Sequence, residues 1–247
     1  MTEKKRSSIR TRMVIVFGTL VIAGFSLLIV LAIRMSRASL LNEVSYHLID
    51  KARDTAAIMD GEVRQWYEYL DGIALQQILH DRSVSYTEKA RFLAQLAKDE
   101  GSVISFGFID PKGIYHLPNG QDFDVSDQKW FKESQGGINR YFSEPFNDIE
   151  TGNLIVQAVV PIMADHDRLL GVLAAVLDGY TMSSSVDEIT IGKTGSCFIL
   201  SKDGVNIANR RRELVNKRFS TIDAAKTDKN FVDVADAIKD FITGKAE

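Results

Sequence analysis

The sequence predicts an α+β chain with one transmembrane helix near its N-terminus, and three observations support this prediction. A run of 21 uncharged residues extends from Met13 to Ile33. A long stretch in which apolar residues recur at helical spacing follows, from Met35 to about Ile73. From Val103 onward, β-rich runs alternate with turn signals and a few helical stretches. This order favours an antiparallel sheet with helices on one side.

The composition excludes several classes of protein. The chain has 30 Lys+Arg and 33 Asp+Glu, a formal net charge of −3, which argues against a nucleic-acid binder with a broad basic face. Hydrophobic residues make up 45% of the chain, too many for a disordered tail. One cysteine excludes an internal disulfide and a cysteine-based zinc cluster. The four histidines, which are His47, His80, His116 and His166, have no metal-ligand spacing. We therefore expect no metal and no cofactor, and from the charge balance we expect no nucleic-acid partner.

The apolar run is long enough to cross a lipid bilayer. At roughly 1.5 Å per residue, a helix over 13–33 measures about 31 Å, close to the hydrocarbon thickness of a membrane. The alternative is a cleaved signal peptide, which has a shorter apolar stretch and a small-residue cleavage site. Arg34-Met35-Ser36-Arg37 follows instead. Five basic residues and only Glu3 precede the span, so the positive-inside rule predicts a cytoplasmic N-terminus and an outer segment after Ile33.

The stretch from Met35 to about Ile73 is expected to form one helix, because proline is absent from it and Gly61 and Gly72 are tolerable in so long an element. About 39 residues would reach ~58 Å. Two interpretations remain open: a helix laid along a domain, or a rod whose lower part pairs with another chain. We expect both together, and hence a homodimer.

A second helix and a β-hairpin are expected next. Ser85-Tyr86-Thr87-Glu88 has the form of a capping box, and Gly101 is expected to end the helix. Val103–Ile109 is predicted to be a strand, followed by the turn Asp110-Pro111-Lys112-Gly113 and a return strand over Ile114–Leu117.

Four further stretches complete this part of the chain. We expect a short helix around 126–134, a brief strand over 141–143 and two long strands over 154–163 and 169–177, joined by the polar turn 164–167.

A second block begins near Gly192 and repeats the strand–turn–strand pattern. Strands are expected over 196–200 and 205–208, with the turn Lys202-Asp203-Gly204 between them and a helical tail over 231–242. These strands are too few for an independently stable sheet, so this second module is expected to be incomplete.

Two motifs suggest chemistry that their spacing does not support. Gly192-Lys193-Thr194 lacks the glycine five positions earlier that a phosphate loop needs, since that position is Asp187. Asp122, Asp124 and Asp127 lack the central glycine and closing glutamate of a calcium loop, so helix capping and turn solvation explain them better.

Residues that could act in catalysis have no convincing arrangement. The spacing yields no Ser–His–Asp or Cys–His set, and a solvated loop explains Glu144, Asp148 and Glu150 as well as paired acids would. We therefore expect no catalytic residues and no enzyme activity.

Several aromatic residues occur at expected loops and strand ends. Trp130-Phe131, Tyr141 and Phe146, together with Asp178, supply the aromatic walls and carboxylate that a small polar or cationic ligand needs. Ordinary core packing explains the rings at least as well on periodicity alone.

Several motifs also occur in one particular order: Asp127–Phe131, Tyr141–Phe146, Val159–Ile162, Gly171–Asp178, Ile191–Leu200 and Lys202–Gly204. With the basic N-terminus, the span and the long helix, this order resembles bacterial methyl-accepting chemotaxis proteins that carry an extracytoplasmic double Cache domain. The resemblance covers nearly the whole chain. It implies two PAS-like modules stacked along one long helix, in the inner membrane of a bacterium with the bulk of the chain in the periplasm.

The resemblance also implies a division of the chain into five parts. These are a cytoplasmic basic tail (1–12), a transmembrane helix (13–33), a long ascending helix (34–75), a membrane-distal ligand-binding module (76–188) and the start of a membrane-proximal module (189–247). A complete receptor of this family recrosses the membrane, whereas no second apolar span follows Ile33. We therefore expect a fragment, a truncated product or an output on another polypeptide.

Amino-acid-binding members of the family have a tyrosine, an arginine, a Trp-Tyr pair, a later tyrosine and an aspartate in the ligand site. The matching positions here, in that order, are Phe123, Gln128, Trp130-Phe131, Phe146 and Asp178. Glutamine cannot supply the charged two-pronged hydrogen bond with which arginine holds a carboxylate. With Tyr141 added, these residues are therefore expected to bind an amine or a largely uncharged ring compound in preference to a standard amino acid.

The function implied is small-molecule sensing in chemotaxis. Two alternatives stay open: the same sensor on a histidine kinase or a diguanylate cyclase, and an anchored structural protein that binds no ligand.

Overall fold

The computed structural model describes residues 9–100, 103–134, 136–148, 151–164, 168–192 and 195–243. The chain divides into two compact units, Met1–Ala57 and Ile58–Glu247, each described by itself.

The first unit is the N-terminal part of helix α1 (Ile9–Ala74). The expected span and the expected long helix prove to be one continuous element, because neither proline nor a helix-ending turn separates them. Large apolar side chains of this part are exposed, including Phe17 at 75% and Leu20 at 69%. Among the described helices, α1 is long and apolar enough to cross a membrane, by length and composition alone.

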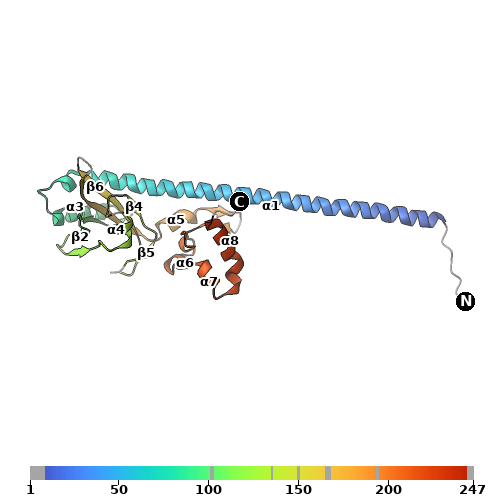
Figure 1. Cartoon of the computed structure of the whole chain (residues 1–247). Coiled ribbons are helices and arrows are strands. Elements are labelled where there is room, and N and C mark those ends of the chain that lie inside the picture. The colour runs from blue at the N-terminus through green and yellow to red at the C-terminus, as the bar shows by residue number, and fades with distance from the viewer. Residues whose placement is uncertain are drawn as a thin grey trace. The chain divides into compact units, whose positions relative to one another are not determined.

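The second unit contains an antiparallel sheet (Figure 1). Seven strands of the described chain form it in the order β3-β2-β1-β7-β6-β4, with β5 paired to β6. Their bounds are β1 (Val103–Ile109), β2 (Ile114–His116), β3 (Asp122–Asp124), β4 (Tyr141–Phe142), β5 (Phe146–Asn147), β6 (Leu154–Ala164) and β7 (Arg168–Asp178). The predicted hairpin and the predicted long pair are present as β1–β2 and β6–β7, whereas β3 and β5 were not predicted.

Helices cover one face of this sheet. The end of α1, α2 (Gln77–His80) and α3 (Tyr86–Asp99) place Leu70, Leu79 and Leu93 against a core that includes Val156 and Leu173. The predicted capping box starts α3: the Glu88 N–H donates to Ser85 Oγ, and the Ser85 N–H donates to the Glu88 carboxylate. The helix ends at Asp99, and the expected C-terminal glycine, Gly101, lies outside the described residues.

The register of β6 against β7 determines which side chains face away from these helices. Val156 is the partner of Leu177, and Gln157 is the partner of Val176. Because successive side chains of a strand point to opposite faces, the first pair faces the helices and the second faces the other side. On that other side the short helix α4 (Lys129–Glu133) packs its buried aromatic rings against β6 and β7. The turn residues 165–167 between these strands lie outside the described residues.

The rest of the second unit consists of short elements (Figure 1). They are α5 (Thr181–Asp187), β8 (Thr190–Ile191), β9 (Gly195–Ser196), β10 (Phe198–Leu200), β11 (Asn206–Asn209), α6 (Arg212–Asn216), α7 (Thr221–Ala224), η1 (Lys229–Phe231) and α8 (Val232–Ile242). The strand expected over 196–200 is divided, because β9 pairs with β8 while β10 pairs with β11. The expected C-terminal helix is present as α8, and α6 and α7 were not predicted. Lys193 and Thr194 of the phosphate-loop-like motif lie outside the described residues.

Candidate functional site

A cavity of about 470 Å³ lies on the face of the sheet opposite α3. Its walls come from strands β1, β2, β3, β5, β6 and β7, from helix α4 and from the loops beside them. Four aromatic rings line it, together with aliphatic and polar side chains: Tyr115, Phe123, Trp130 and Phe146. All of this lining belongs to the second unit.

Four of the seven site residues expected from the sequence line this cavity: Phe123, Gln128, Trp130 and Phe146. Gln128 directly precedes α4, so the start of that helix directs both Gln128 and Trp130 towards the cavity. Phe123 lies in β3 opposite Tyr115 of β2, which brings two rings side by side on one wall. The roles of these residues in binding remain predictions.

The other three expected residues lie away from the lining. Phe131 is buried in the core beside Trp130, in an edge-to-face contact with 5.8 Å between ring centroids. The Tyr141 hydroxyl donates a hydrogen bond to Glu133. Burial first, and then this hydrogen bond, raise the pKa of Tyr141 well above its ordinary value.

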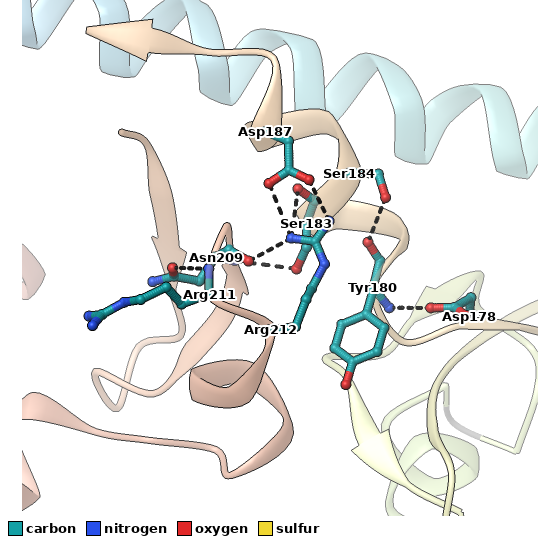
Figure 2. A network of polar contacts seen from close by, with 8 residues as sticks. All are labelled: Asp178, Tyr180, Ser183, Ser184, Asp187, Asn209, Arg211 and Arg212. Atoms are coloured by element: carbon teal, nitrogen blue, oxygen red, sulfur yellow. Dashed lines mark hydrogen bonds and ion pairs between the residues drawn. The ribbon is translucent and has the colours of Figure 1, made fainter. Parts of the chain in front are cut away.

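Asp178 ends β7, and its Oδ1 accepts a hydrogen bond from the Tyr180 N–H at 2.7 Å (Figure 2). Its cross-strand partner is Ile155, which does line the cavity. Asp178 therefore lies next to the cavity, with its carboxylate bonded to the backbone that leads into α5.

Two carboxylates that the sequence did not assign to a ligand site line the cavity. Asp124 ends β3, and hydrogen bonds from Ser126, its side chain first and then its backbone, hold the pKa of Asp124 below its ordinary value of 3.8. Asp148 follows β5, and its Oδ2 accepts hydrogen bonds from the backbone N–H and the hydroxyl of Thr151, at 3.1 and 2.7 Å. In the sequence, Asp124 suggested a calcium ligand or a turn residue, and Asp148 suggested one of a set of paired acids or a residue of a solvated loop.

The described lining has no Lys, Arg or His to balance these carboxylates. A cavity of this kind attracts cations and disfavours anions, because opposite charges interact more strongly where water is partly excluded. The aromatic rings add to this preference, since their faces carry partial negative charge. The arrangement is thus suited to a small organic cation.

The three aspartates considered as calcium ligands have separate partners. Asp122 Oδ1 lies 2.7 Å from His116 Nδ1, Asp124 accepts from Ser126, and Asp127 pairs with Lys132 at 2.8 Å. Within the described part of the chain, groups of three or more metal-ligating residues are absent.

Gln157 is the residue of the cavity that sequence reasoning missed most clearly. It is the fourth of the 11 residues of β6, lines the cavity and is only 4% exposed. The signal that could have revealed it is a lone amide within the apolar run Leu154–Met163.

A glycine gives one wall of the cavity its shape. The Tyr115 ring lies against Gly107 of β1, where a Cβ atom would overlap the Tyr115 hydroxyl. A larger residue at Gly107 would therefore displace a ring of the lining.

Comparisons with known proteins agree with this architecture. The Cache domain family matches residues 35–245. The methyl-accepting chemotaxis protein PscA of Pseudomonas syringae is 21% identical over 234 residues, covering 92% of this chain and 35% of that protein. The chain thus spans about a third of the length of that relative.

Two solved structures show the same fold. The ligand-binding domain of the Pseudomonas aeruginosa amino acid chemoreceptor PctC, in complex with GABA, has a TM-score of 0.54 at 22% identity, over 69% of this chain and 76% of that one. The sensory domain of the Campylobacter jejuni chemoreceptor Tlp3, with isoleucine bound, has a TM-score of 0.53 at 14% identity, over 77% of this chain and 79% of that one. The order of motifs, the sheet with its helical face and the extent of the family match lead to one conclusion: this chain belongs to the Cache domain family.

Proposed function

We propose that this chain is the sensing region of a bacterial membrane chemoreceptor and that its cavity binds a small organic amine. The observation that carries the proposal is the pairing of Asp124 and Asp148 with aromatic rings, in a lining whose described residues include no cation. Membership of the Cache family and the likeness to PscA support sensing in chemotaxis over the other outputs considered.

The charge of the lining supports an amine over an α-amino acid. An ammonium group donates charge-assisted hydrogen bonds to the carboxylates. The carboxylate of an amino acid would meet Gln128, a neutral amide, and would lose hydration without gaining a charged partner. PctC and Tlp3 hold GABA and isoleucine in their structures, so this cavity would differ from theirs in ligand class.

We further propose the membrane arrangement of the chain. The apolar part of α1 spans the bilayer over 13–33, the basic residues before it remain in the cytoplasm, and the parts over 34–75, 76–188 and 189–247 lie in the periplasm. The exposed apolar side chains in the part of α1 that precedes Ala57 in the sequence support contact with lipid and with a second copy of the chain. The distal module would have two ways of packing against the long helix. Ligand binding would then shift the population between these two states, to the extent that the ligand's affinity differs between them.

Binding can be measured by calorimetry on the full chain in lipid nanodiscs, with phenethylamine and L-phenylalanine as probes. The two molecules differ only by the α-carboxylate, so their ratio isolates its effect. We expect phenethylamine to bind and L-phenylalanine to bind at least tenfold more weakly. Asp148→Asn should weaken phenethylamine binding about tenfold or more, because the charged hydrogen bond is lost.

The matched control is Asp203→Asn, which removes the same charge from an exposed turn outside the cavity. Tighter binding of L-phenylalanine than of phenethylamine, with no effect of Asp148→Asn, would refute the amine assignment. Orientation is tested separately: a phosphatase that is active only outside the cytoplasm, fused after residue 247, should be active in whole cells.

A further inference from the structure

Gln157 has a buried side-chain amide that the fold itself does not satisfy. It is 4% exposed, and its Nε2 has no hydrogen-bond partner among the described residues. An unpaired buried donor costs folding free energy, and an aliphatic residue would suit this strand better. The amide lines the cavity, on the face of β6 that looks away from the helices.

The backbone N–H and the backbone carbonyl of Gln157 both form hydrogen bonds with Ser143. The Gln157 N–H donates to Ser143 Oγ at 2.8 Å, and the Ser143 N–H donates to the Gln157 carbonyl at 2.9 Å. Ser143 is itself buried, at 4% exposed. Ser143 is thus a positioning residue, which holds the start of the Gln157 side chain at the wall of the cavity.

The carboxylate of Asp148 and the amide of Gln157 lie at different places along β6. The Asp148 N–H donates to the Asn153 carbonyl at 2.8 Å, so Asp148 lies beside Asn153, four residues before Gln157. At about 3.3 Å per residue, the two backbones are about 13 Å apart along the strand. That separation leaves room for both side chains and a small ligand between them.

We propose that the Gln157 side-chain amide donates a hydrogen bond to an oxygen or nitrogen acceptor of the bound amine. The ligands of this cavity are then amines that carry an acceptor at the end opposite the ammonium group. This inference rests on the proposed function, because it needs an amine held by the carboxylates of the cavity. It explains why a buried polar residue interrupts an otherwise apolar strand.

Tyramine and phenethylamine are the probes for this proposal, since they differ by one phenolic hydroxyl. In calorimetry on the full chain in nanodiscs, tyramine should bind about tenfold more tightly than phenethylamine, the worth of one neutral hydrogen bond. Gln157→Leu should abolish this preference, so that the variant binds the two amines with affinities within about twofold of each other. Gln95→Leu, at an exposed position of α3, is the matched control and should preserve the preference.

Thermal unfolding without ligand gives an independent readout. Gln157→Leu removes an unpaired donor, so the unliganded variant should melt at the same temperature as the native chain or higher. A purely structural amide would give a lower melting temperature, and that result overturns the proposal.

The calorimetry distinguishes a failure of the proposed role of Gln157 from a failure of the proposed amine site. Retention of the tyramine preference in Gln157→Leu overturns the role of Gln157 and leaves the amine site intact. Failure of the native chain to bind either amine overturns both.

Discussion

The guanidinium of Arg212 pairs with the carboxylate of Asp187, with 2.5 Å between Nη2 and Oδ2 and 3.2 Å between Nη1 and Oδ1 (Figure 2). Nη1 also donates to the Asn209 carbonyl at 2.7 Å. The Arg212 guanidinium lies 5.7 Å from the centre of the Tyr180 ring. These contacts connect α5, which follows the large sheet, with β11 and α6 of the C-terminal elements.

Arg212→Met should therefore loosen the attachment of these C-terminal elements. We expect the melting temperature of the full chain to fall by about 2–4 °C at neutral pH, since one partly exposed ion pair and a backbone hydrogen bond are lost. Arg211→Met is the control: Arg211 joins the network through its backbone N–H, which donates to Asn209 Oδ1 and survives the substitution. Equal melting of both variants would contradict a structural role for the pair.

The same ion pair predicts a pH dependence. Hydrogen bonds from Arg212 lower the pKa of Asp187 below its ordinary value of 3.8. A carboxyl with a lowered pKa in the folded state stabilises the fold above its unfolded pKa, and this contribution is lost as the pH falls through the folded value. When the pH is lowered from about 5 to about 3, the melting temperature of the native chain should therefore fall further than that of Arg212→Met. Parallel curves for the two proteins would argue against this ionic contribution.

Gly107→Ala should distort the cavity, because its Cβ would overlap the Tyr115 hydroxyl. We expect a destabilisation of about 1–3 kcal/mol from overpacking, and weaker binding of phenethylamine. Gly72→Ala is the matched control, since a Cβ there meets nothing within 4 Å and the position is an exposed part of α1. That substitution should stabilise the helix by up to about 1 kcal/mol. Chemical denaturation and calorimetry measure both effects, and unchanged binding in Gly107→Ala would show that the ring can move freely.

Ser85→Ala should destabilise the distal module through the start of α3. The Ser85 hydroxyl accepts the Glu88 N–H at 3.3 Å, and loss of such a cap costs about 1 kcal/mol. Gln95→Ala, in the exposed middle of the same helix, should change stability by only a few tenths of a kcal/mol. Denaturant unfolding of the full chain tests the difference, and a cap variant as stable as the control would contradict it.

Local signals account for the parts of the fold that the sequence predicts well. The capping box before α3, the turn of the first hairpin and the two long apolar runs each depend on neighbouring residues alone. β3 and β5 were missed because each gains its strand geometry by pairing with a strand already in the sheet. Cys197 interrupts the strand expected over 196–200, since the chain changes pairing partner there.

The candidate site depends on register more than on residue type. Gln157 faces the cavity and Val156 faces the helices only because β6 pairs with β7 in one particular register. Asp148 reaches the lining through the short strand β5, which the sequence does not predict. Four of the residues that match the family pattern line the cavity. Asp178 instead accepts a hydrogen bond from the Tyr180 N–H, and the sequence contains no signal for that contact.

Gln128→Arg tests whether one position decides between amines and amino acids. Gln128 lines the cavity, so the substitution would add a guanidinium that can hold a carboxylate with two hydrogen bonds. L-phenylalanine binding should become roughly 10- to 100-fold tighter, the worth of a charged hydrogen bond. Phenethylamine binding should weaken, because the new cation repels its ammonium group and competes for the carboxylates of Asp124 and Asp148.

Gln128→Met separates charge from shape in this experiment. Methionine has a similar length and no charge, so it should leave the ratio of the two affinities within about threefold of the native value. If Gln128→Arg and Gln128→Met change the two affinities alike, position 128 acts through shape, and the absence of a charged partner there does not explain ligand choice. If only Gln128→Arg reverses the preference, the charge at this single cavity position decides which class of ligand binds.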